Sequence, residues 1–349
     1  MLKTLRFAVI GAGNIAKIHV QALLQIPTAQ VAVICSRREG PGRALAASCG
    51  ADWEADYRTA VRRADVDAVA VCTPSATHAE IGIAGAEAGK HLLVEKPIDV
   101  TLASVDHLIA AARQANVVLA CVFPLRTMAG AHQVKAALAA GRLGRRPLAG
   151  VFFKWDRPQN YYDSSWRGTW DHDGGGALMN QAIHNIDLLQ WLVGPVSHVI
   201  GRTATLAHRM ETEDTASAVL TFANGALGVI QGATSCWPGD AARVELRGEK
   251  GTIVLEEGRI VTWKLAESTP GEEEAMLNLE GTGGGSGAGD PMAIGSERHR
   301  RQIVDFIEAV RQGRPPLIDG AEARKSVEII RAIYRSAADG KMVALPLAE

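Results

Sequence analysis

The sequence has few cysteines, few aromatic residues and almost no net charge. Its 349 residues contain five cysteines, and no two of them have the Cys-x-x-Cys spacing. They are Cys35, Cys49, Cys72, Cys121 and Cys236. An odd number of cysteines, several within apolar runs, is typical of small buried thiols. We therefore expect no disulfide framework and no zinc site, as in a reducing cytoplasm.

The balance of charge and the length of the apolar runs exclude two further classes of protein. A formal net charge of −1 gives no support for a general nucleic-acid or membrane-surface binder. No apolar run reaches the roughly 18 residues of a membrane span, and the first residues do not resemble a secretion signal. We expect a cytoplasmic protein. At about 150 residues per domain the length predicts two domains, and 47% apolar residues can fill a large core.

The amino terminus carries a dinucleotide-binding pattern. The apolar run from Arg6 to Ile10 predicts a strand buried on both faces, and a helical pattern begins five residues later. Between them lies Gly11-Ala12-Gly13-Asn14-Ile15-Ala16, a G-x-G-x-x-A sequence in the strand–turn–helix context that the fingerprint requires. Gly11 permits the tight turn, and Gly13 lets backbone amides approach a pyrophosphate. We predict that Gly11, Gly13, Asn14 and Ile15 bind the cofactor.

The end of the second predicted strand, Val31 to Cys35, bears on the choice of cofactor. It is followed by Ser36-Arg37-Arg38, where an acidic residue would hydrogen-bond the ribose 2′-hydroxyl of NAD. A hydroxyl and two guanidinium groups instead suit a 2′-phosphate. Arg37 could also stack on the adenine, which both cofactors carry. The pattern favours NADP(H) and leaves NAD(H) open.

Strands and helices continue to alternate up to residue 125. Further strands are predicted at 67–72, 91–94 and 117–122, with helices at 77–88 and 101–115. This alternation predicts a doubly wound parallel sheet, with the strand ends at one edge. That edge gathers Thr73-Pro74, Glu95-Lys96 and Arg126. The sequence Val94-Glu95-Lys96-Pro97 alone could be an ordinary surface loop, but at this edge Lys96 is predicted at the nicotinamide end of a cofactor crevice.

The pattern changes near residue 126, so we predict a Rossmann domain at 1–125 and a second α/β domain at 126–349. The C-terminal helices, at about 296–312 and 321–338, are free to pack back on the first domain. Period-two alternation from 197 to 265, with a hairpin signal at Asn224-Gly225, predicts an antiparallel meander. Its apolar face suggests a homodimer or homotetramer. The glycine-rich residues 281–289 are predicted to form a mobile loop.

Two segments of the second half are candidate substrate-binding elements. Four aromatic residues fall within 161–170, which predicts either a loop closing over the core or a wall for a sugar ring. Gly174-Gly175-Gly176 then opens a helical run from Ala177 to Leu192. Residues three and four apart share a helix face, so Asn180, His184 and Asp187 are predicted to form one polar stripe. A lone histidine there would more often be a core residue, but three polar groups in register favour a site.

In this order the motifs resemble those of the glucose–fructose oxidoreductase/inositol dehydrogenase/rhizopine catabolism (Gfo/Idh/MocA) family. The resemblance rests on the G-x-G-x-x-A turn, Thr73-Pro74 with His78, Glu95-Lys96-Pro97, the glycine-rich helix and Gly313-Arg314-Pro315-Pro316. It implies a Rossmann domain followed by an α/β domain with a large open antiparallel sheet. It also implies oxidation of a secondary alcohol of a sugar, polyol or cyclitol by NAD(P).

The resemblance assigns candidate roles to residues of this chain. Lys96 and His184 correspond to the catalytic residues, and family members often carry aspartate where this chain has Asn180. An amide supplies no charge, so substrate hydrogen bonding is the expected role of Asn180. The other predicted substrate-binding residues are Arg126, Tyr162, Trp166, Arg167 and Asp187. The other predicted cofactor-binding residues are Ser36, Arg37, Arg38, Thr73, Pro74, His78, Glu95 and Lys96.

The expected mechanism uses His184 as the base and Lys96 as the hydrogen-bond donor to the reacting oxygen, because an imidazole ordinarily titrates near neutrality. Lys96 as the base is the open alternative. Three other functions are considered: a nucleotide-sensing binding protein, an NAD-dependent glycoside hydrolase of the same family, and a C–C or C=C reductase. Intact Lys96 and His184 argue against the first, and the polar aromatic segment gives little support to the third.

Overall fold

The computed structural model describes residues 3–145, 148–163, 166–279 and 295–347. Contacts divide the chain into two units. The first comprises Met1–Phe123 with Gly295–Arg324, and the second comprises Pro124–Ile294 with Lys325–Glu349. The predicted glycine-rich loop at 281–289 lies outside the described residues. Within the described ranges, every helix is too short or too polar to cross a membrane.

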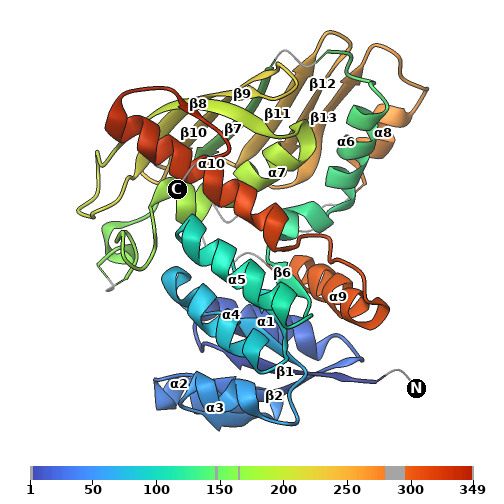
Figure 1. The fold of residues 1–349 in the computed structure, drawn as a ribbon. Coiled ribbons are helices and arrows are strands. Elements are labelled where there is room, and N and C mark those ends of the chain that lie inside the picture. Colours follow the sequence, from blue (N-terminus) through green and yellow to red (C-terminus); the bar gives the residue numbers. More distant parts are fainter. Residues whose placement is uncertain (1–2, 146–147, 164–165, 280–294, 348–349) are drawn as a thin grey trace. The chain divides into compact units, whose positions relative to one another are not determined.

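The first unit is built around a six-stranded sheet in the order β3-β2-β1-β4-β5-β6, with all strands parallel. This is the strand order of the Rossmann fold, so the predicted fold class is confirmed. The strands are β1 (Leu5–Ile10), β2 (Ala29–Cys35), β3 (Asp52–Glu54), β4 (Ala68–Val71), β5 (His91–Val94) and β6 (Leu119–Cys121). The intervening helices are α1 (Asn14–Leu24), α2 (Glu39–Cys49), α3 (Tyr57–Arg62), α4 (His78–Glu87) and α5 (Leu102–Gln114) (Figure 1).

Helix α9 (Glu297–Gln312) completes the core of this unit, although it lies near the end of the chain. Its buried residues Ile303, Phe306 and Ile307 belong to the same apolar cluster as the residues of β1 and α1. The ring centroids of Phe7 and Phe306 are 6.1 Å apart. Helices α2 and α3 and strand β3 were not predicted from the sequence, because a three-residue strand and a six-residue helix are too short to show a clear apolar period.

The second unit contains an eight-stranded sheet in the order β13-β12-β11-β7-β10-β9-β8-β14. Its strands are β7 (Leu148–Lys154), β8 (Val196–Ala204), β9 (Thr215–Phe222), β10 (Leu227–Ala233), β11 (Arg243–Gly248), β12 (Gly251–Glu256), β13 (Arg259–Leu265) and β14 (Val343–Ala344). The sheet is mostly antiparallel as predicted, but β7 and β10 pair in parallel. The hairpin expected at Asn224-Gly225 joins β9 and β10.

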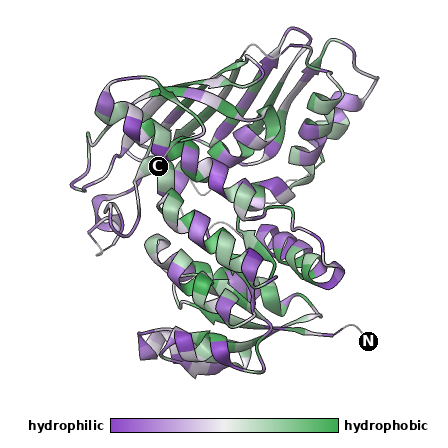
Figure 2. Cartoon of the chain, in the orientation of Figure 1, coloured by the Kyte–Doolittle hydropathy of each residue, from purple (hydrophilic) through white to green (hydrophobic). Residues whose placement is uncertain are grey.

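Helices cover one face of this sheet (Figure 1). They are α6 (Ala129–Ala139), α7 (Ile183–Val193) and most of α10 (Gly320–Asp339), and α8 (Glu272–Leu277) packs beside β13. Hydrophilic and hydrophobic residues alternate along α10 (Figure 2), and its buried residues Val327, Ile330 and Ile333 recur at helical spacing. The helix-bearing face is therefore the core of the second unit.

Candidate functional site

The turn between β1 and α1 has the geometry of a dinucleotide-binding loop. Gly11 has φ +122°, and a Cβ there would lie 2.4 Å from the carbonyl oxygen of Cys72. Glycine is therefore the residue that the turn accommodates. Gly13 precedes Asn14 and Ile15 at the start of α1, and no side chain of the described residues caps that helix. A Cβ on Gly13 would meet no atom within 4 Å in the part of the chain that the structure describes. Open space in front of uncapped helix amides fits a pyrophosphate.

The residues after β2 offer donors and no carboxylate. The Ser36 hydroxyl donates a hydrogen bond to the carbonyl of Arg38 at 2.8 Å, which leaves its oxygen able to accept another bond. The side chains of Arg37 and Arg38 are exposed. The nearby Glu54 carboxylate accepts hydrogen bonds from the backbone N–H groups of Ala55 and Asp56. It is thus engaged with its own turn.

His78 joins the loops that follow β4 and β5. Its ring is buried, with Nε2 2.9 Å from the carbonyl oxygen of Thr73 and Nδ1 2.7 Å from that of Pro97. Thr73 and Pro74 lead into this connection, and the Thr77 hydroxyl donates to that of Thr73. His78 therefore holds the two predicted cofactor loops together, and we assign it this structural role rather than contact with the nucleotide.

Glu95 and Lys96 differ in their surroundings. The carboxylate of Glu95 is buried and lies 2.7 Å from Nε2 of His19 on α1, and it also accepts the backbone N–H of Lys96. Lys96 itself is half-buried at the end of β5. The carboxylate is thus engaged inside the unit, while the lysine is the member of the pair that remains partly exposed.

In the second unit, the predicted helix begins with a π-helical segment. Ala177–Ala182 forms this segment, and the α-helix α7 starts at Ile183. The sequence analysis expected one α-helix, and π segments occur frequently at functional sites. A Cβ on Gly176 would lie 1.9 Å from the carbonyl oxygen of Glu213, and one on Gly175 would lie 2.1 Å from the Tyr334 hydroxyl oxygen. These two glycines allow the helix to start against its neighbours.

Glu213 fixes the start of this helical segment. Its carboxylate accepts hydrogen bonds from the backbone N–H groups of Gly176 and Leu178 and from the Tyr334 hydroxyl. Burial raises the pKa of Glu213 to about 7, although these donors favour the charged form. Only 3% of the residue is exposed. The sequence offered no spacing signal for Glu213, because it precedes a strand far from the helix along the chain.

Asn180 belongs to a hydrogen-bonded group of side chains. Its Nδ2 donates to Asp173, and its Oδ1 accepts from Nε2 of Gln181 at 2.9 Å. The same Gln181 amide donates to the Tyr161 hydroxyl at 2.8 Å. This network of Asp173, Asn180, Gln181 and Tyr161 contains three residues that the sequence analysis missed. Asn180 and His184 are both half-buried.

The aromatic segment presents a different tyrosine from the one predicted. Tyr162 is buried, and its hydroxyl donates to Thr234 at 2.7 Å. Tyr161 instead lies under Arg167, whose guanidinium carbon is 4.5 Å from the ring centroid and 4.9 Å from that of Trp166. Tyr161, Trp166 and Arg167 are all half-buried, so we assign the polar aromatic surface to these three and a packing role to Tyr162.

Arg126 and Asp187 pair with each other. Nε and a terminal nitrogen of Arg126 each donate to a different oxygen of Asp187 at 2.7 Å, and neither side chain is more than 1% exposed. The guanidinium carbon also lies 5.5 Å from the Trp191 ring centroid. A bidentate pair with this burial anchors α7. We therefore assign both residues an anchoring role rather than contact with the substrate. Of the predicted polar stripe, Asp187 lies on α7 and belongs to this pair, whereas Asn180 lies in the π-helical segment.

The two units each match a known protein family. The family model "Oxidoreductase family, NAD-binding Rossmann fold" matches residues 5–123, and "GFO/IDH/MocA C-terminal domain" matches residues 131–254. The WlbA dehydrogenase from Bordetella pertussis, solved with NADH and UDP-GlcNAcA, is 35% identical with a TM-score of 0.91 and 99% coverage of both chains.

Other relatives cover nearly the whole chain. Levoglucosan dehydrogenase, solved with NADH and levoglucosan, is 25% identical with a TM-score of 0.87, covering 99% of this chain and 100% of that chain. Myo-inositol 2-dehydrogenase from Thermotoga maritima is 28% identical, and the alignment covers 98% of each protein. The protein therefore belongs to the Gfo/Idh/MocA family of oxidoreductases, whose first domain is an NAD-binding Rossmann fold.

Proposed function

We propose that the protein is an NAD(P)-dependent dehydrogenase that interconverts a secondary hydroxyl and a keto group of a sugar, polyol or cyclitol. The observation that carries this proposal is the dinucleotide turn at Gly11 and Gly13, in a chain that aligns over 99% of its length with sugar dehydrogenases solved with NADH. Because WlbA was solved with UDP-GlcNAcA, a UDP-linked sugar acid is the first substrate to test.

In the proposed mechanism, His184 takes the proton of the substrate hydroxyl while a carbonyl forms at the same carbon. Bound nicotinamide supplies the acceptor for the hydride that leaves this carbon. Lys96 donates a hydrogen bond to the reacting oxygen and stabilises its developing negative charge. Asn180 and Gln181 orient the neighbouring hydroxyl groups, with Asp173 and Tyr161 holding the two amides in place.

For the cofactor, we infer that Ser36, Arg37 and Arg38 favour NADP(H). One hydroxyl and two exposed guanidinium groups follow β2, and the nearby Glu54 carboxylate is engaged with its own backbone. WlbA and levoglucosan dehydrogenase were solved with NADH, so this chain would differ from them at the 2′ position. We also propose that the chain acts as a homo-oligomer formed through the face of the eight-stranded sheet that the described helices do not cover.

A substrate panel tests the proposal. Purified protein is mixed with NAD or NADP and with UDP-GlcNAcA, levoglucosan, myo-inositol and other sugars, and reduced-nicotinamide absorbance is followed. We expect turnover on at least one of them. On that substrate, His184→Ala and Lys96→Met should each lower kcat by roughly 10²–10⁴-fold, the usual contribution of acid–base groups.

His132→Ala is the control, since His132 is an exposed histidine on α6. It should keep wild-type kcat. Full activity in both the His184 and Lys96 variants would contradict the proposed roles. A protein that binds nucleotide but turns over nothing in the panel would contradict the proposed function.

A further inference from the structure

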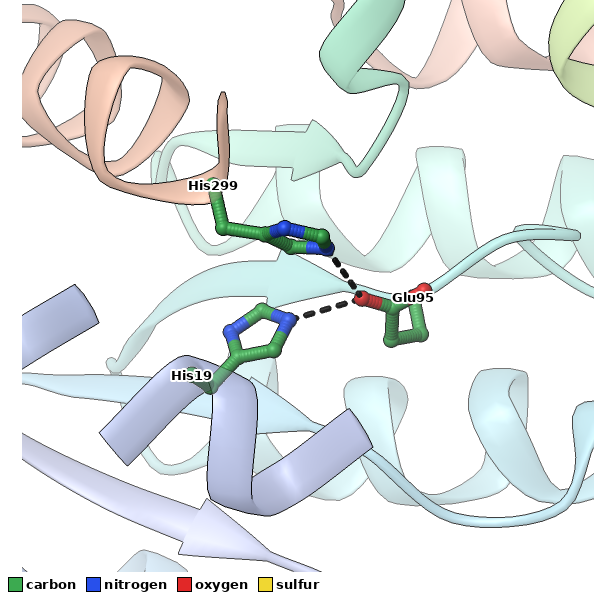
Figure 3. A group of neighbouring side chains, drawn as sticks. All are labelled: His19, Glu95 and His299. Atoms are coloured by element: carbon green, nitrogen blue, oxygen red, sulfur yellow. Dashed lines mark hydrogen bonds and ion pairs between the residues drawn. The ribbon is translucent and has the colours of Figure 1, made fainter. Parts of the chain in front are cut away.

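Three ionisable side chains from distant parts of the sequence meet inside the first unit (Figure 3). His19 comes from α1, Glu95 from the end of β5 and His299 from the first turn of α9. All three are buried, with 0%, 4% and 5% of their surface exposed. We call them the histidine–glutamate cluster. The sequence analysis did not identify it, because each histidine alone is a single polar residue on an apolar helix face.

The distances within the cluster indicate hydrogen bonding rather than metal coordination. Nε2 of His19 lies 2.7 Å from Oε1 of Glu95, whereas Nε2 of His299 lies 3.9 Å from the same oxygen. Two ligands at about 2.1 Å from one tetrahedral ion would lie about 3.4 Å apart. The His19–Glu95 contact is much shorter than this and has the length of a charge-assisted hydrogen bond.

The other carboxylate oxygen of Glu95 is hydrogen-bonded to the backbone of the next residue, Lys96. Oε2 accepts the backbone N–H of Lys96 at 3.1 Å, and the Glu95 N–H donates to the carbonyl of Val71 in the neighbouring strand. Burial tends to raise the pKa of Glu95, but the hydrogen bond from His19 and the nearby positive charge of Lys96 keep it well below its usual range. Glu95 is therefore a charged carboxylate that connects α1 to the backbone of Lys96.

His299 supports this arrangement as a neutral ring. Burial and the neighbouring His19 lower the pKa of His299 to about 4. The two imidazole rings pack edge to face, with centroids 5.4 Å apart. Nδ1 of each ring is buried and has no hydrogen-bond partner among the described residues. Burying two unsatisfied polar atoms costs stability, and such sites are retained most often where they serve a function.

We propose that His19, backed by His299, is a positioning residue for catalysis, because it holds Glu95 so that the Glu95 carboxylate fixes the backbone of Lys96. This inference rests on the proposed function, in which Lys96 acts on the substrate oxygen. It extends that function because the position of Lys96 then depends, through Glu95, on a residue of α1, the helix that begins at the dinucleotide turn. An error of about 1 Å in a catalytic group can cost about 10²-fold in rate.

Paired variants of His19 test the inference. His19→Gln can keep a side-chain N–H donor for Glu95, whereas His19→Leu cannot. We expect His19→Leu and Glu95→Gln to lower kcat by about tenfold or more, with KM and the nucleotide dissociation constant close to wild type. His19→Gln should recover most of the lost kcat, which a role in packing alone would not predict.

The matched control is His91→Leu, at the opposite end of β5. His91 Nδ1 accepts the backbone N–H of Val118, so this variant also loses one imidazole hydrogen bond. It is expected to lower the melting temperature and to leave kcat unchanged. Equal losses of kcat in His91→Leu and His19→Leu would overturn the inference, as would wild-type kcat in His19→Leu.

Two measurements do not depend on turnover. Hydrogen exchange at the Lys96 amide should be faster in His19→Leu than in wild type, while α1 and α9 keep their protection. Unchanged exchange would overturn the inference even if no sugar in the panel is a substrate. Metal analysis of the native protein is the second measurement, and a stoichiometric metal that is lost in Glu95→Gln would also overturn the inference.

Discussion

At the residue scale, the choice of cofactor depends on the few side chains after β2. Arg37 and Arg38 are exposed and Ser36 is half-buried, so none of them supports the core. Their replacement should therefore change nucleotide binding with little effect on folding. A guanidinium bound to a phosphate contributes a charge-assisted hydrogen bond that a 2′-hydroxyl cannot replace.

We predict that NADP gives the higher kcat/KM in the wild type. Arg37→Ala and Arg38→Ala should together raise KM for NADP by about tenfold or more, in line with a lost charge-assisted bond, and change KM for NAD much less. Steady-state kinetics with both cofactors checks this. Arg62→Ala, at the end of α3, is a control for the loss of a surface arginine. A wild-type preference for NAD would contradict the prediction that Arg37 and Arg38 bind the 2′-phosphate of NADP.

Single residues also show which features of the candidate site could be predicted from the sequence. The roles predicted for Gly11 and Gly13 follow from their spacing and from the absence of a Cβ, and both features are visible in a sequence. Tyr161 and Tyr162 are adjacent, and which of them faces Gln181 is decided by the local backbone. Arg126 and Asp187 are 61 residues apart, so their pairing could not be read from spacing. Because both side chains are buried in this pair, we assign Arg126 and Asp187 to the anchoring of α7 rather than to substrate binding.

At the scale of elements, the helix that carries His184 depends on a carboxylate outside it. The segment Ala177–Ala182 is π-helical, and Glu213 accepts the N–H groups at its start. A period of apolar residues predicts that a helix exists, but it does not distinguish a π turn from an α turn. The start of this helix is fixed by tertiary contacts of Glu213 and Tyr334 with a glycine-rich entry.

Glu213 should make stability depend on pH. Its folded-state pKa of about 7 lies above the ordinary value, so the folded state binds the proton more tightly. The contribution of Glu213 to the free energy of unfolding is therefore fully present below its unfolded-state pKa and is lost as the pH rises through 7. Tyr334, which donates to Glu213, has a pKa raised well above its usual range and stays neutral throughout. The wild type should therefore lose about 1–3 kcal/mol from this group between pH 5 and pH 8.

Glu213→Gln separates this effect from the other titrating groups. Its amide nitrogen would face the backbone N–H of Gly176 or Leu178, so the variant should melt lower at pH 5. The difference in melting temperature from wild type should be smaller at pH 8, where the wild-type carboxylate is ionised. Glu211→Gln, close by on the same connection, is the control. A difference that is constant with pH would contradict the raised pKa of Glu213.

At the scale of the whole molecule, the second unit has one face of its sheet covered by helices, and among the described residues the other face carries exposed apolar side chains. Ile200 and Val219 are directly paired between β8 and β9, and Leu227 and Leu148 between β10 and β7. Each of these four side chains is 46–50% exposed. Apolar residues in register over four neighbouring strands form a continuous patch, unlike the scattered exposed residues of ordinary surfaces.

A second copy of the chain is the occupant that we propose for this face, and Val219→Lys tests it. A lysine at the centre of the patch would place like charges together in a symmetric pair of sheets. We expect light scattering to give an oligomeric mass for the wild type and a smaller one for the variant, with unchanged circular dichroism because the side chain points away from the core. Leu206→Lys is the control, since Leu206 is 72% exposed beyond β8 and outside the patch. A monomeric wild type, or dissociation by both variants alike, would show that the face does not hold the copies together.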